Sequence, residues 1–316
     1  NIVDNDANIV DALTNTSSVN SITNGYQVIL TGAASVKGES GTALTIKTIG
    51  SGGSAVTAIE GTKATIDSLS SIFNASNTSS RVRYLTTLSD LTSNTDFYAT
   101  VSSHQTYDVT DTATNLTSGQ ALIPLAARLT VTGTATAAQA TTLDGLSSAP
   151  VTYSISDTAT NIAGIASGGR NTAVNITATG NATIAEATTI YGASNSGTTT
   201  YSISDSHTNY NTLVGAGGGE FSTGEKAIQN GATSITVTGS VTHTVGGELL
   251  ALTAPVSLAT VTGTSAQLSA LTLGTGDSIA TLTTSDAADV TEATAMHARA
   301  TTVTAYALVD TSANVV

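Results

Sequence analysis

The residues of this sequence with the clearest capacity for chemistry are aspartates followed four positions later by an asparagine. The stretch TYSISDTATNI, from Thr152 to Ile162, contains one such pair, and close copies read TYDVTDTATNL from Thr106 and TYSISDSHTNY from Thr200. A carboxylate supplies acceptor oxygens, and a carboxamide supplies both donors and an acceptor. The spacing recurs at Asp4/Asn8, Asp90/Asn94, Asp111/Asn115, Asp157/Asn161, Asp205/Asn209 and Asp310/Asn314.

Two roles fit such a pair, and the structural one is favoured. An aspartate at the end of a strand caps the turn that follows, because it accepts backbone N–H groups that have no other partner. The asparagine then bonds the open backbone of the next coil at a corner. We therefore expect all of these pairs to be structural caps that form a ladder through the molecule.

Calcium binding is the alternative role for these carboxylates. Most of the aspartates alternate along the repeat with glycine, which keeps like charges apart. Two pairs do not, Asp90 with Asp111 and Asp286 with Asp310, and a Ca²⁺ ion could bridge either pair through carboxylate and carbonyl oxygens. The glycine-rich nonapeptide of calcium-binding β-helices does not occur. Calcium at these four residues is thus a hypothesis, and no other cofactor is expected.

The sequence shows no signature of catalysis. Its four histidines have no metal-binding spacing, and without cysteine a zinc site is not expected. Neither a Gly-x-Ser-x-Gly elbow nor a phosphate-binding Gly-x-x-x-x-Gly-Lys loop occurs. We therefore predict that the chain is not an enzyme and has no catalytic or cofactor-binding residues.

Charge and hydropathy narrow the range of partners. The 316 residues carry a formal net charge of -13 with only 9 Lys and Arg, which disfavours binding to nucleic acid or to anionic membranes. No apolar run of about 18 residues occurs, so no membrane insertion is expected. Aromatic residues make up 4% of the chain, too few to fill a wide core, so a thin core of small residues is favoured.

The elements that must position these residues recur about every 24 residues. A strand-like stretch ends at that spacing on Asp111, Gly133, Asp157, Gly180 and Asp205. A unit of this size cannot bury its apolar face alone and must stack on its neighbours. The pattern predicts a single elongated parallel β-solenoid over residues 1–316, of about 13 coils, each with one short strand followed by a short helical turn. An all-β right-handed helix is the alternative.

Three further features complete the predicted architecture. The Thr-x-x-Gln/Glu spacing at Thr136/Gln139 and Thr183/Glu186 is that of a capping box, which favours helical turns after the strands. The Gly-rich stretch near 215–226 is interpreted as a loop inserted in one coil. Both ends of the sequence fall within the repeat, so we expect a segment of a longer chain, or copies that cap one another end to end.

Each predicted strand has one aliphatic stripe and one Ser/Thr stripe, because apolar and hydroxyl residues alternate along it. The aliphatic stripe is expected inside, and the other stripe is expected to face solvent in regular rows. Rows of hydroxyl and methyl groups on a flat sheet suggest a face that binds ice or a glycan. This exposed face is predicted to consist of Thr130, Thr132, Thr177, Thr179, Thr236, Thr238, Thr260 and Thr262.

Repeats such as SISDTATNI alternating with TVTGTATAAQATTL resemble those of very large, Thr/Ala-rich secreted bacterial surface proteins of adhesin, RTX-like and surface-layer type. The resemblance covers most of the chain. It implies an extracellular or cell-surface location and a non-catalytic structural or adhesive role, as a fibre, filament, stalk or surface-layer component. The implied partners are neighbouring repeats or further copies end to end, and a cell-surface glycan. The alternative function is a ligand-binding solenoid that uses its Ser/Thr face for ice or a glycan.

Overall fold

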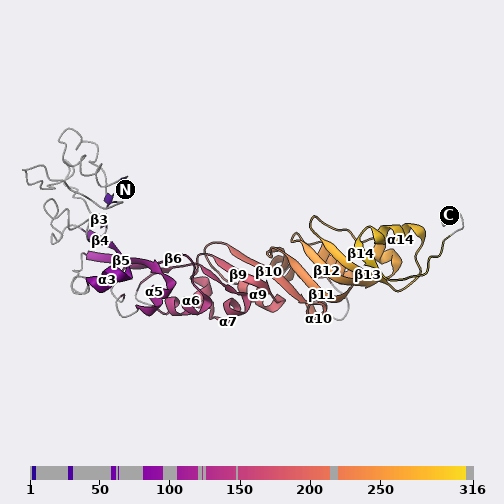
Figure 1. The fold of residues 1–316 in the computed structure, drawn as a ribbon, viewed down its shortest axis with the longest axis horizontal. Helices are drawn as coiled ribbons and strands as arrows, with labels where there is room; N and C mark the ends of the chain where they lie inside the picture. The colour runs from indigo at the N-terminus through magenta and orange to yellow at the C-terminus, as the bar shows by residue number, and fades with distance from the viewer. Residues whose placement is uncertain are drawn as a thin grey trace, which may run out of the picture. The chain divides into compact units, whose positions relative to one another are not determined.

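In the computed structural model of this protein, β-strands alternate with short helices along the chain (Figure 1). The chain divides into two compact units, of which unit 1 comprises Asn1–Ala135 and Thr142–Tyr153, and unit 2 comprises Thr136–Thr141 and Ser154–Val316. The structure describes residues 2–4, 28–30, 58–61, 63, 81–94, 105–119, 123, 126–146, 149–213 and 220–310.

Two seven-stranded parallel sheets are present, and within each sheet the strands lie side by side in the order of the chain. One sheet consists of β1 (Ile2–Asp4), β2 (Val28–Leu30), β3 (Ala58–Gly61), β4 (Arg81–Thr86), β5 (Gln105–Thr112), β6 (Arg128–Thr132) and β7 (Val151–Thr152). The other consists of β8 (Ile155–Thr158), β9 (Ile176–Ala182), β10 (Thr199–Ser206), β11 (Ile235–Thr242), β12 (Val256–Gly263), β13 (Ser278–Thr284) and β14 (Ala300–Val303).

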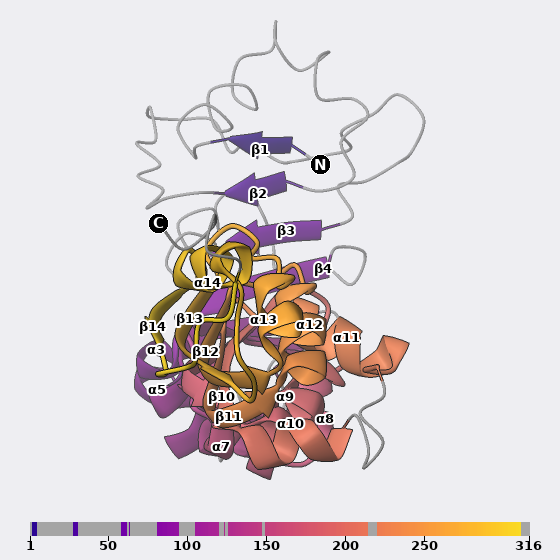
Figure 2. The same ribbon diagram turned by 90° about the vertical axis from the view of Figure 1, so that its right-hand side faces the viewer.

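From β4 onwards, short α-helices follow most of the described strands. They are α3 (Leu88–Ser93), α5 (Ala113–Ser118), α6 (Ala137–Asp144), α7 (Ala159–Gly164), α8 (Ser167–Asn171), α9 (Ile184–Tyr191), α10 (His207–Leu213), α11 (Thr223–Asn230), α12 (His243–Leu250), α13 (Ser265–Ser269) and α14 (Val290–His297). Helices α13 and α14 pack beside each other, with α13 against β12 and β13 and α14 against β14 of the second sheet (Figure 2). None of the described helices is long and apolar enough to span a membrane.

Capping residues set where these helices begin. The hydroxyl of Thr183 accepts the amide of Glu186, and the Glu186 carboxylate accepts the amide of Thr183, so one donor is satisfied in each direction. Thr136 and Gln139 exchange the same two bonds at the start of α6. Both predicted capping boxes are therefore present, and the helices extend over five to eight residues rather than ending as single turns.

The predicted β-solenoid is wrong, and so is the all-β alternative. The chain forms two separate, open parallel sheets with helices alternating between the strands, which is an α/β arrangement and not a stack of single-strand coils. Strand pairing stops between β7 and β8, since Val151 pairs with Leu129 of β6 whereas Ile155 pairs with Ile176 of β9. The period of the sequence gives the spacing of strand–helix units. It does not determine whether those units form closed coils or an open sheet.

Other predictions fall with the solenoid. The filament prediction depended on an uninterrupted stack of coils, and the two separate sheets do not provide one. An α/β arrangement also gives no basis for the adhesin or surface-layer assignment, because a fold alone does not specify a function.

The core of each unit lies between its sheet and the helices that follow the strands. Tyr153 and Ile155 are buried, as the alternation predicts, whereas Ser154 and Ser156, which were expected to face solvent, are half-buried. On α9, Ile184, Ala187 and Ile190 are buried along one face of the helix. Each fully buried Ile or Leu side chain contributes about 2 kcal/mol relative to an exposed one, so packing holds helices that are too short to be stable alone.

The glycines and the aspartates that end the strand-like stretches of the repeat are not equivalent. Gly133, Gly180 and Gly239 have φ angles of 77°, 76° and 84°, in the left-handed region that other residues rarely occupy. The register between β9 and β10 shifts around Gly180, and the register between β11 and β12 shifts around Gly239. Gly180 and Gly239 therefore form bulges that insert extra residues before the helix. Gly263 does not adopt a positive φ.

The predicted Gly-rich loop is in part a helix. Residues 223–226 belong to α11, which begins after the N-cap residue Ser222. Residues 215–219 of the stretch lie outside the described residues. The connection between β10 and β11 thus contains a second helix besides α10.

Candidate functional site

Three aspartates of the repeated phrase make the same set of hydrogen bonds, and we call Asp111, Asp157 and Asp205 the corner aspartates. Each lies two residues before the first residue of a helix. One oxygen of each accepts the first amide of a helix 20 to 23 residues earlier in the chain. The donors are Leu88 N of α3 at 3.0 Å, Ala137 N of α6 at 2.9 Å and Ile184 N of α9 at 2.9 Å.

These bonds satisfy backbone donors that the helix itself cannot satisfy. The first four N–H groups of an α-helix have no partner within it, and a negative charge near them is favourable. A corner aspartate therefore caps the helix of the preceding repeat and joins two neighbouring repeats. The sequence interpretation had the aspartate cap the turn that follows it. That role belongs only to Oδ1, and the bond of Oδ2 to the preceding repeat was not predicted.

The second oxygen of each corner aspartate is used inside its own repeat. Oδ1 accepts the amide of the following residue at 2.7 to 2.8 Å and the asparagine Nδ2 at 2.6 to 2.8 Å. Asn115, Asn161 and Asn209 thus hold the carboxylate in place. Their Nδ2 groups donate to the aspartate of the same repeat, and not to the backbone of the next one as the sequence interpretation had it.

Hydrogen bonding lowers the pKa of two of the corner aspartates, Asp111 and Asp157. Partial burial raises the pKa of Asp111, but donors from Asn115, Thr112 and Leu88 outweigh that effect, so the pKa lies below its ordinary value. The same balance lowers the pKa of Asp157. Both carboxyls are consequently ionised at neutral pH, and their hydrogen bonds are charge-assisted and strong.

Asp90 has its asparagine partner but a different position. It is the third residue of α3, where its amide donates to Thr87 Oγ1 at 3.2 Å. Its carboxylate accepts Thr86 Oγ1 at 2.7 Å and Asn94 Nδ2 at 2.9 Å. The Asp90/Asn94 pair therefore stabilises the first turns of a single helix.

Asp286 and Asp310 cap preceding helices as the corner aspartates do. Asp286 Oδ1 accepts the Ser265 amide of α13 at 2.6 Å, and Asp310 Oδ2 accepts the Val290 amide of α14 at 3.1 Å. The bond from Ser265, with a second from the Thr284 hydroxyl, lowers the pKa of Asp286. Of the remaining predicted caps, Asp4 ends β1 with its side chain outside the described part, and Asn8 and Asn314 are outside it altogether.

The structure gives the calcium hypothesis no support. Among the described residues, no three His, Asp or Glu side chains gather where they could hold a metal ion. Each of the four carboxylates suggested as ligands accepts hydrogen bonds instead, and Asp286 and Asp310 serve the first amides of two different helices. An ion at either pair would have to compete with those donors.

The threonines of the predicted face lie on outward positions of both sheets. Thr132, Thr177, Thr179, Thr236 and Thr238 are exposed, whereas Thr130, Thr260 and Thr262 are half-buried. Strand register aligns them with other hydroxyl residues. The rows include Thr110, Thr130 and Thr152; Thr112 and Thr132; Ser156, Thr177 and Thr200; Thr158 and Thr179; Ser206 and Thr238; Ser204, Thr236, Ser257 and Ser278; Ser240, Thr260, Thr281 and Thr302; and Thr242, Thr262 and Thr283.

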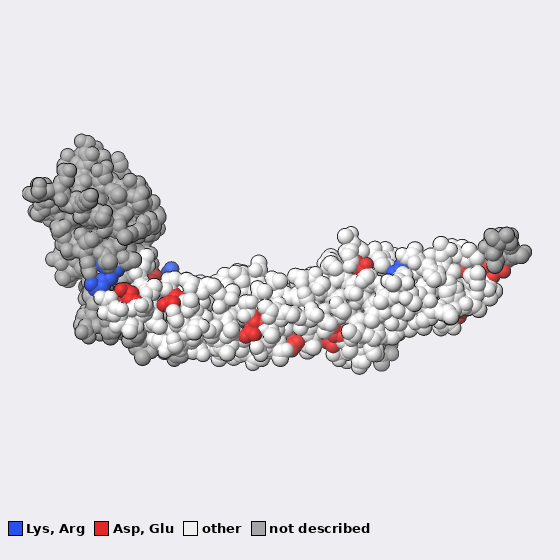
Figure 3. Space-filling model, viewed as in Figure 1, with Lys and Arg blue, Asp and Glu red and all other residues white. Residues whose placement is uncertain are grey.

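Some of these hydroxyls donate hydrogen bonds to backbone carbonyls of the neighbouring strand. Thr238 Oγ1 donates to the Asp205 carbonyl at 3.3 Å, and Thr262 Oγ1 donates to the Val241 carbonyl at 3.2 Å. Figure 3 shows that most of the visible face of the described residues is uncharged, with Lys and Arg gathered near one end and other charged side chains scattered. The rows are neutral because they consist of Ser and Thr, and part of their hydrogen-bonding capacity stabilises neighbouring strands.

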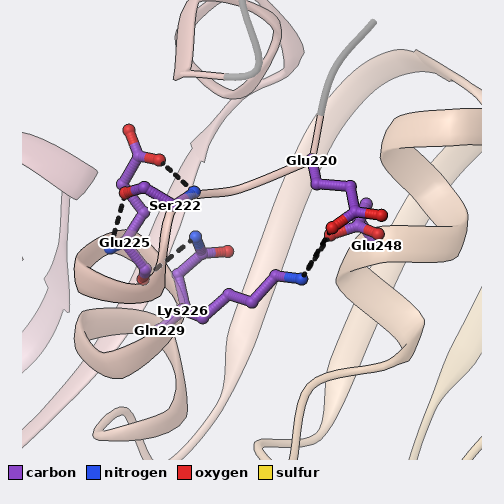
Figure 4. Close-up of polar contacts among 6 residues, drawn as sticks. All are labelled: Glu220, Ser222, Glu225, Lys226, Gln229 and Glu248. Carbon is purple, nitrogen blue, oxygen red and sulfur yellow. Dashed lines mark hydrogen bonds and ion pairs between the residues drawn. The ribbon is translucent and has the colours of Figure 1, made fainter.

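Helix α11 carries a cluster of charged side chains that sequence reasoning missed (Figure 4). Lys226 Nζ lies 2.8 Å from Glu248 Oε2 on α12 and 4.0 Å from Glu220 Oε2. The hydrogen bond to Glu248 raises the pKa of Lys226. Glu225 belongs to the capping box with Ser222, the only sequence signal that pointed to this helix. The cluster links α11 to α12 through a half-buried ion pair, in which the side chain of Lys226 is 36% exposed and that of Glu248 18%.

Capping-box glutamates also link neighbouring helices. Thr160 Oγ1 of α7 donates to Glu186 Oε1 of α9 at 2.7 Å, and Ser265 Oγ of α13 donates to Glu292 Oε2 of α14 at 2.9 Å. The hydrogen bond from Thr160 is the main reason that the pKa of Glu186 is lowered. Sequence spacing identified Glu186 as a cap but gave no sign of its second partner.

Asparagines do bond the next repeat, but they are not the ones in the repeated phrase. Asn175 Oδ1 accepts the Thr198 amide at 2.9 Å, and Asn230 Oδ1 accepts the Thr253 amide at 2.7 Å. Both pairs are separated by 23 residues. A spacing of 23 residues is close to the repeat period, and this agreement is the sign of these contacts that the sequence offered.

Comparison with known proteins gives no relative for this chain: no family model matches it, and neither a curated protein nor a solved structure matches it. The candidate site is therefore described by its geometry alone. That geometry is a set of carboxylates, carboxamides and hydroxyls whose hydrogen bonds hold strand–helix repeats together.

Proposed function

We propose that this chain is a non-catalytic structural segment of a repeat protein that acts outside the cell or at its surface. The observation that carries the proposal is the bonding of the corner aspartates, whose two oxygens both accept donors from the chain itself. A general base needs an oxygen within reach of its substrate, and a metal ligand needs one that faces the ion. Carboxylates engaged in this way hold the backbone in place instead.

The extracellular location is supported by the sequence. The chain is acidic and consists of the Thr/Ala-rich repeats described above, whose resemblance to secreted surface proteins implies that location. Antibodies raised against the purified chain should label intact cells of the source organism, or its culture supernatant. Labelling that requires permeabilised cells would contradict the proposed location.

The structural role is tested by replacing Asp111, Asp157 and Asp205 with asparagine, singly and together. Each replacement should lower the melting temperature, and the losses should accumulate, because each residue links a different pair of repeats. Wild-type protein and the triple variant should give the same result in a screen against glycans and divalent cations. Binding that the wild type shows and a fully folded variant lacks would make the corner aspartates a ligand site.

A second candidate function is a ligand-binding Ser/Thr face, favoured by the in-register hydroxyl rows through Thr236 and Thr260. Ice is the ligand best suited to neutral, regularly spaced hydroxyl and methyl groups, and a glycan is the other. The wild type should then show thermal hysteresis that Thr236→Lys abolishes, whereas Glu220→Lys should leave it unchanged. Absence of both hysteresis and ice-crystal shaping would dismiss ice, and a negative glycan screen would dismiss the glycan.

A further inference from the structure

Three Asn-x-Ser/Thr sequons lie in the described part of the chain, at Asn115, Asn175 and Asn181. In such a sequon the asparagine Nδ2 is the acceptor of an N-linked glycan, and the Ser or Thr hydroxyl is part of the recognised signal. The other three sequons of the sequence lie outside the described residues, at Asn15, Asn74 and Asn77. Because the chain is rich in Asn, Ser and Thr, the spacing alone does not select a site, and the surroundings of each asparagine decide.

Two of these asparagines are engaged in the fold. Asn115 Nδ2 donates to the carboxylate of Asp111 at 2.7 Å, a charge-assisted bond. Asn175 is half-buried, and its Oδ1 accepts the Thr198 amide at 2.9 Å and the Thr198 hydroxyl at 3.0 Å. A sugar on either carboxamide would crowd these contacts, so neither asparagine is suited to modification in the folded chain.

Asn181 is different, because the bulge at Gly180 holds it outside the core. It is exposed, as are Thr179 and Gly180 before it, so the alternation of buried and exposed residues along β9 stops at this point. Its side chain makes no hydrogen bond with any other described residue. A Cβ at Gly180 would have no heavy atom within 4 Å, so the space beside Asn181 is open. The Asn181 carboxamide is therefore free to carry a bulky group.

The hydroxyl of this sequon is also exposed. Thr183 lies at the start of α9, where its Oγ1 accepts the Glu186 amide at 3.3 Å and donates to Glu186 Oε2 at 3.1 Å. Long bonds at the surface are exchanged for bonds to water or to an enzyme at little cost. In the sequon of Asn115, by contrast, the Thr117 hydroxyl is half-buried and donates to the Ala113 carbonyl at 2.9 Å.

We propose that Asn181 is the acceptor of an N-linked glycan, and that the donor is an activated sugar whose anomeric carbon carries a phosphate leaving group. In the transfer, Nδ2 forms a bond to that carbon, the bond from the carbon to the phosphate oxygen breaks, and Nδ2 loses one proton. The leaving phosphate takes the electron pair of the broken bond, so no oxidant or reductant is needed. The inference rests on the extracellular location proposed above, and it places the glycan on β9 beside Thr179.

Mass spectrometry of the full chain, recovered from the surface or the culture supernatant of the source organism, tests the proposal. Fragmentation that keeps sugars on their residues should locate a glycan on Asn181 and none on Asn115 or Asn175. A single sugar would show a nucleotide-activated donor, and a preassembled oligosaccharide would show a lipid-linked one. Protein found outside the cell with an unmodified Asn181 would overturn the glycan but leave the proposed location standing.

Secretion of the full chain from a eukaryotic host that glycosylates its exported proteins tests the acceptor independently of the natural location. Asn181→Gln should abolish the glycan at this position, whereas Thr183→Ser, which keeps both the sequon and the helix cap, should retain it. After enzymatic removal of sugars, Asn181→Gln should melt as the wild type does, because Asn181 makes no bond, and Asn115→Gln should melt at a lower temperature. A wild type that is secreted with Asn181 unmodified would overturn the proposal.

Discussion

Asp157 shows how a single residue couples two repeats, since it accepts the first amide of α6 and is itself held by Asn161. Asp157→Ala should lower the free energy of unfolding by about 2 kcal/mol, because it removes charge-assisted bonds and a helix cap. Asp157→Asn keeps one acceptor oxygen and should cost about 1 kcal/mol. Urea denaturation followed by circular dichroism measures both values.

The control for these variants is Glu220→Gln, at a side chain that is 80% exposed and 4.0 Å from its nearest cation. It should change stability by less than about 0.5 kcal/mol. If Asp157→Ala were no less stable than this control, the bond to the Ala137 amide would be an incidental contact and the corner aspartates would not hold the repeats together.

Acid should unfold the chain through the same residues. The folded-state pKa values of Asp111, Asp157 and Glu186 lie below their ordinary values, so the folded protein binds fewer protons than the unfolded chain in acid. The stability they contribute is complete above the ordinary carboxyl pKa and is lost as pH falls through the lowered values. The melting temperature should be flat near neutral pH and fall below about pH 4, and the triple Asn variant should show a shallower fall.

At the scale of elements, the glycine bulges give a prediction with an internal control. A Cβ at Gly180 would have no heavy atom within 4 Å, so Gly180→Ala is opposed only by the φ angle of 76°. It should destabilise the protein by about 1 kcal/mol. A Cβ at Gly164 in α7 is equally free of contacts, but no positive φ applies there, so Gly164→Ala should be neutral or stabilising. Equal melting temperatures for the two variants would contradict the bulge assignment.

Elements of this protein could be predicted from local patterns, and their partners could not. Alternation identified the buried Tyr153 and Ile155, and Thr-x-x-Glu spacing identified the start of α9, because both patterns act within a few residues. The bond from Asp157 to Ala137 joins residues 20 apart in sequence, and nothing near Asp157 reveals it. Helix α11 was hidden by the glycines around it, although Ser222 and Glu225 have capping-box spacing.

At the scale of the whole molecule, the repeat period was visible but its geometry was not. A spacing of about 24 residues is satisfied by closed coils and by strand–helix units of an open sheet alike. The sequence interpretation gave Gly180 and Asp157 the same place in the repeat. It therefore overlooked the bulge residues that lie between Gly180 and the start of α9. The pairing break after β7 has no counterpart in the sequence pattern, since the repeated phrase runs across it.

The net charge of -13 on 316 residues gives a final prediction for the whole chain. Self-repulsion of a dispersed negative charge weakens the folded state, and salt screens it. Sodium chloride should therefore raise the melting temperature by a few degrees.

Calcium chloride at matched ionic strength should add nothing further, because the oxygens of Asp286 and Asp310 already accept backbone amides. Differential scanning fluorimetry with calcium, with magnesium and with a chelator, all at one ionic strength, makes the comparison. A saturable rise in melting temperature that is specific to calcium, lost in Asp286→Asn and kept in Glu220→Gln, would contradict this expectation. It would mean that the ion displaces the Ser265 amide from Asp286 and that the chain binds calcium.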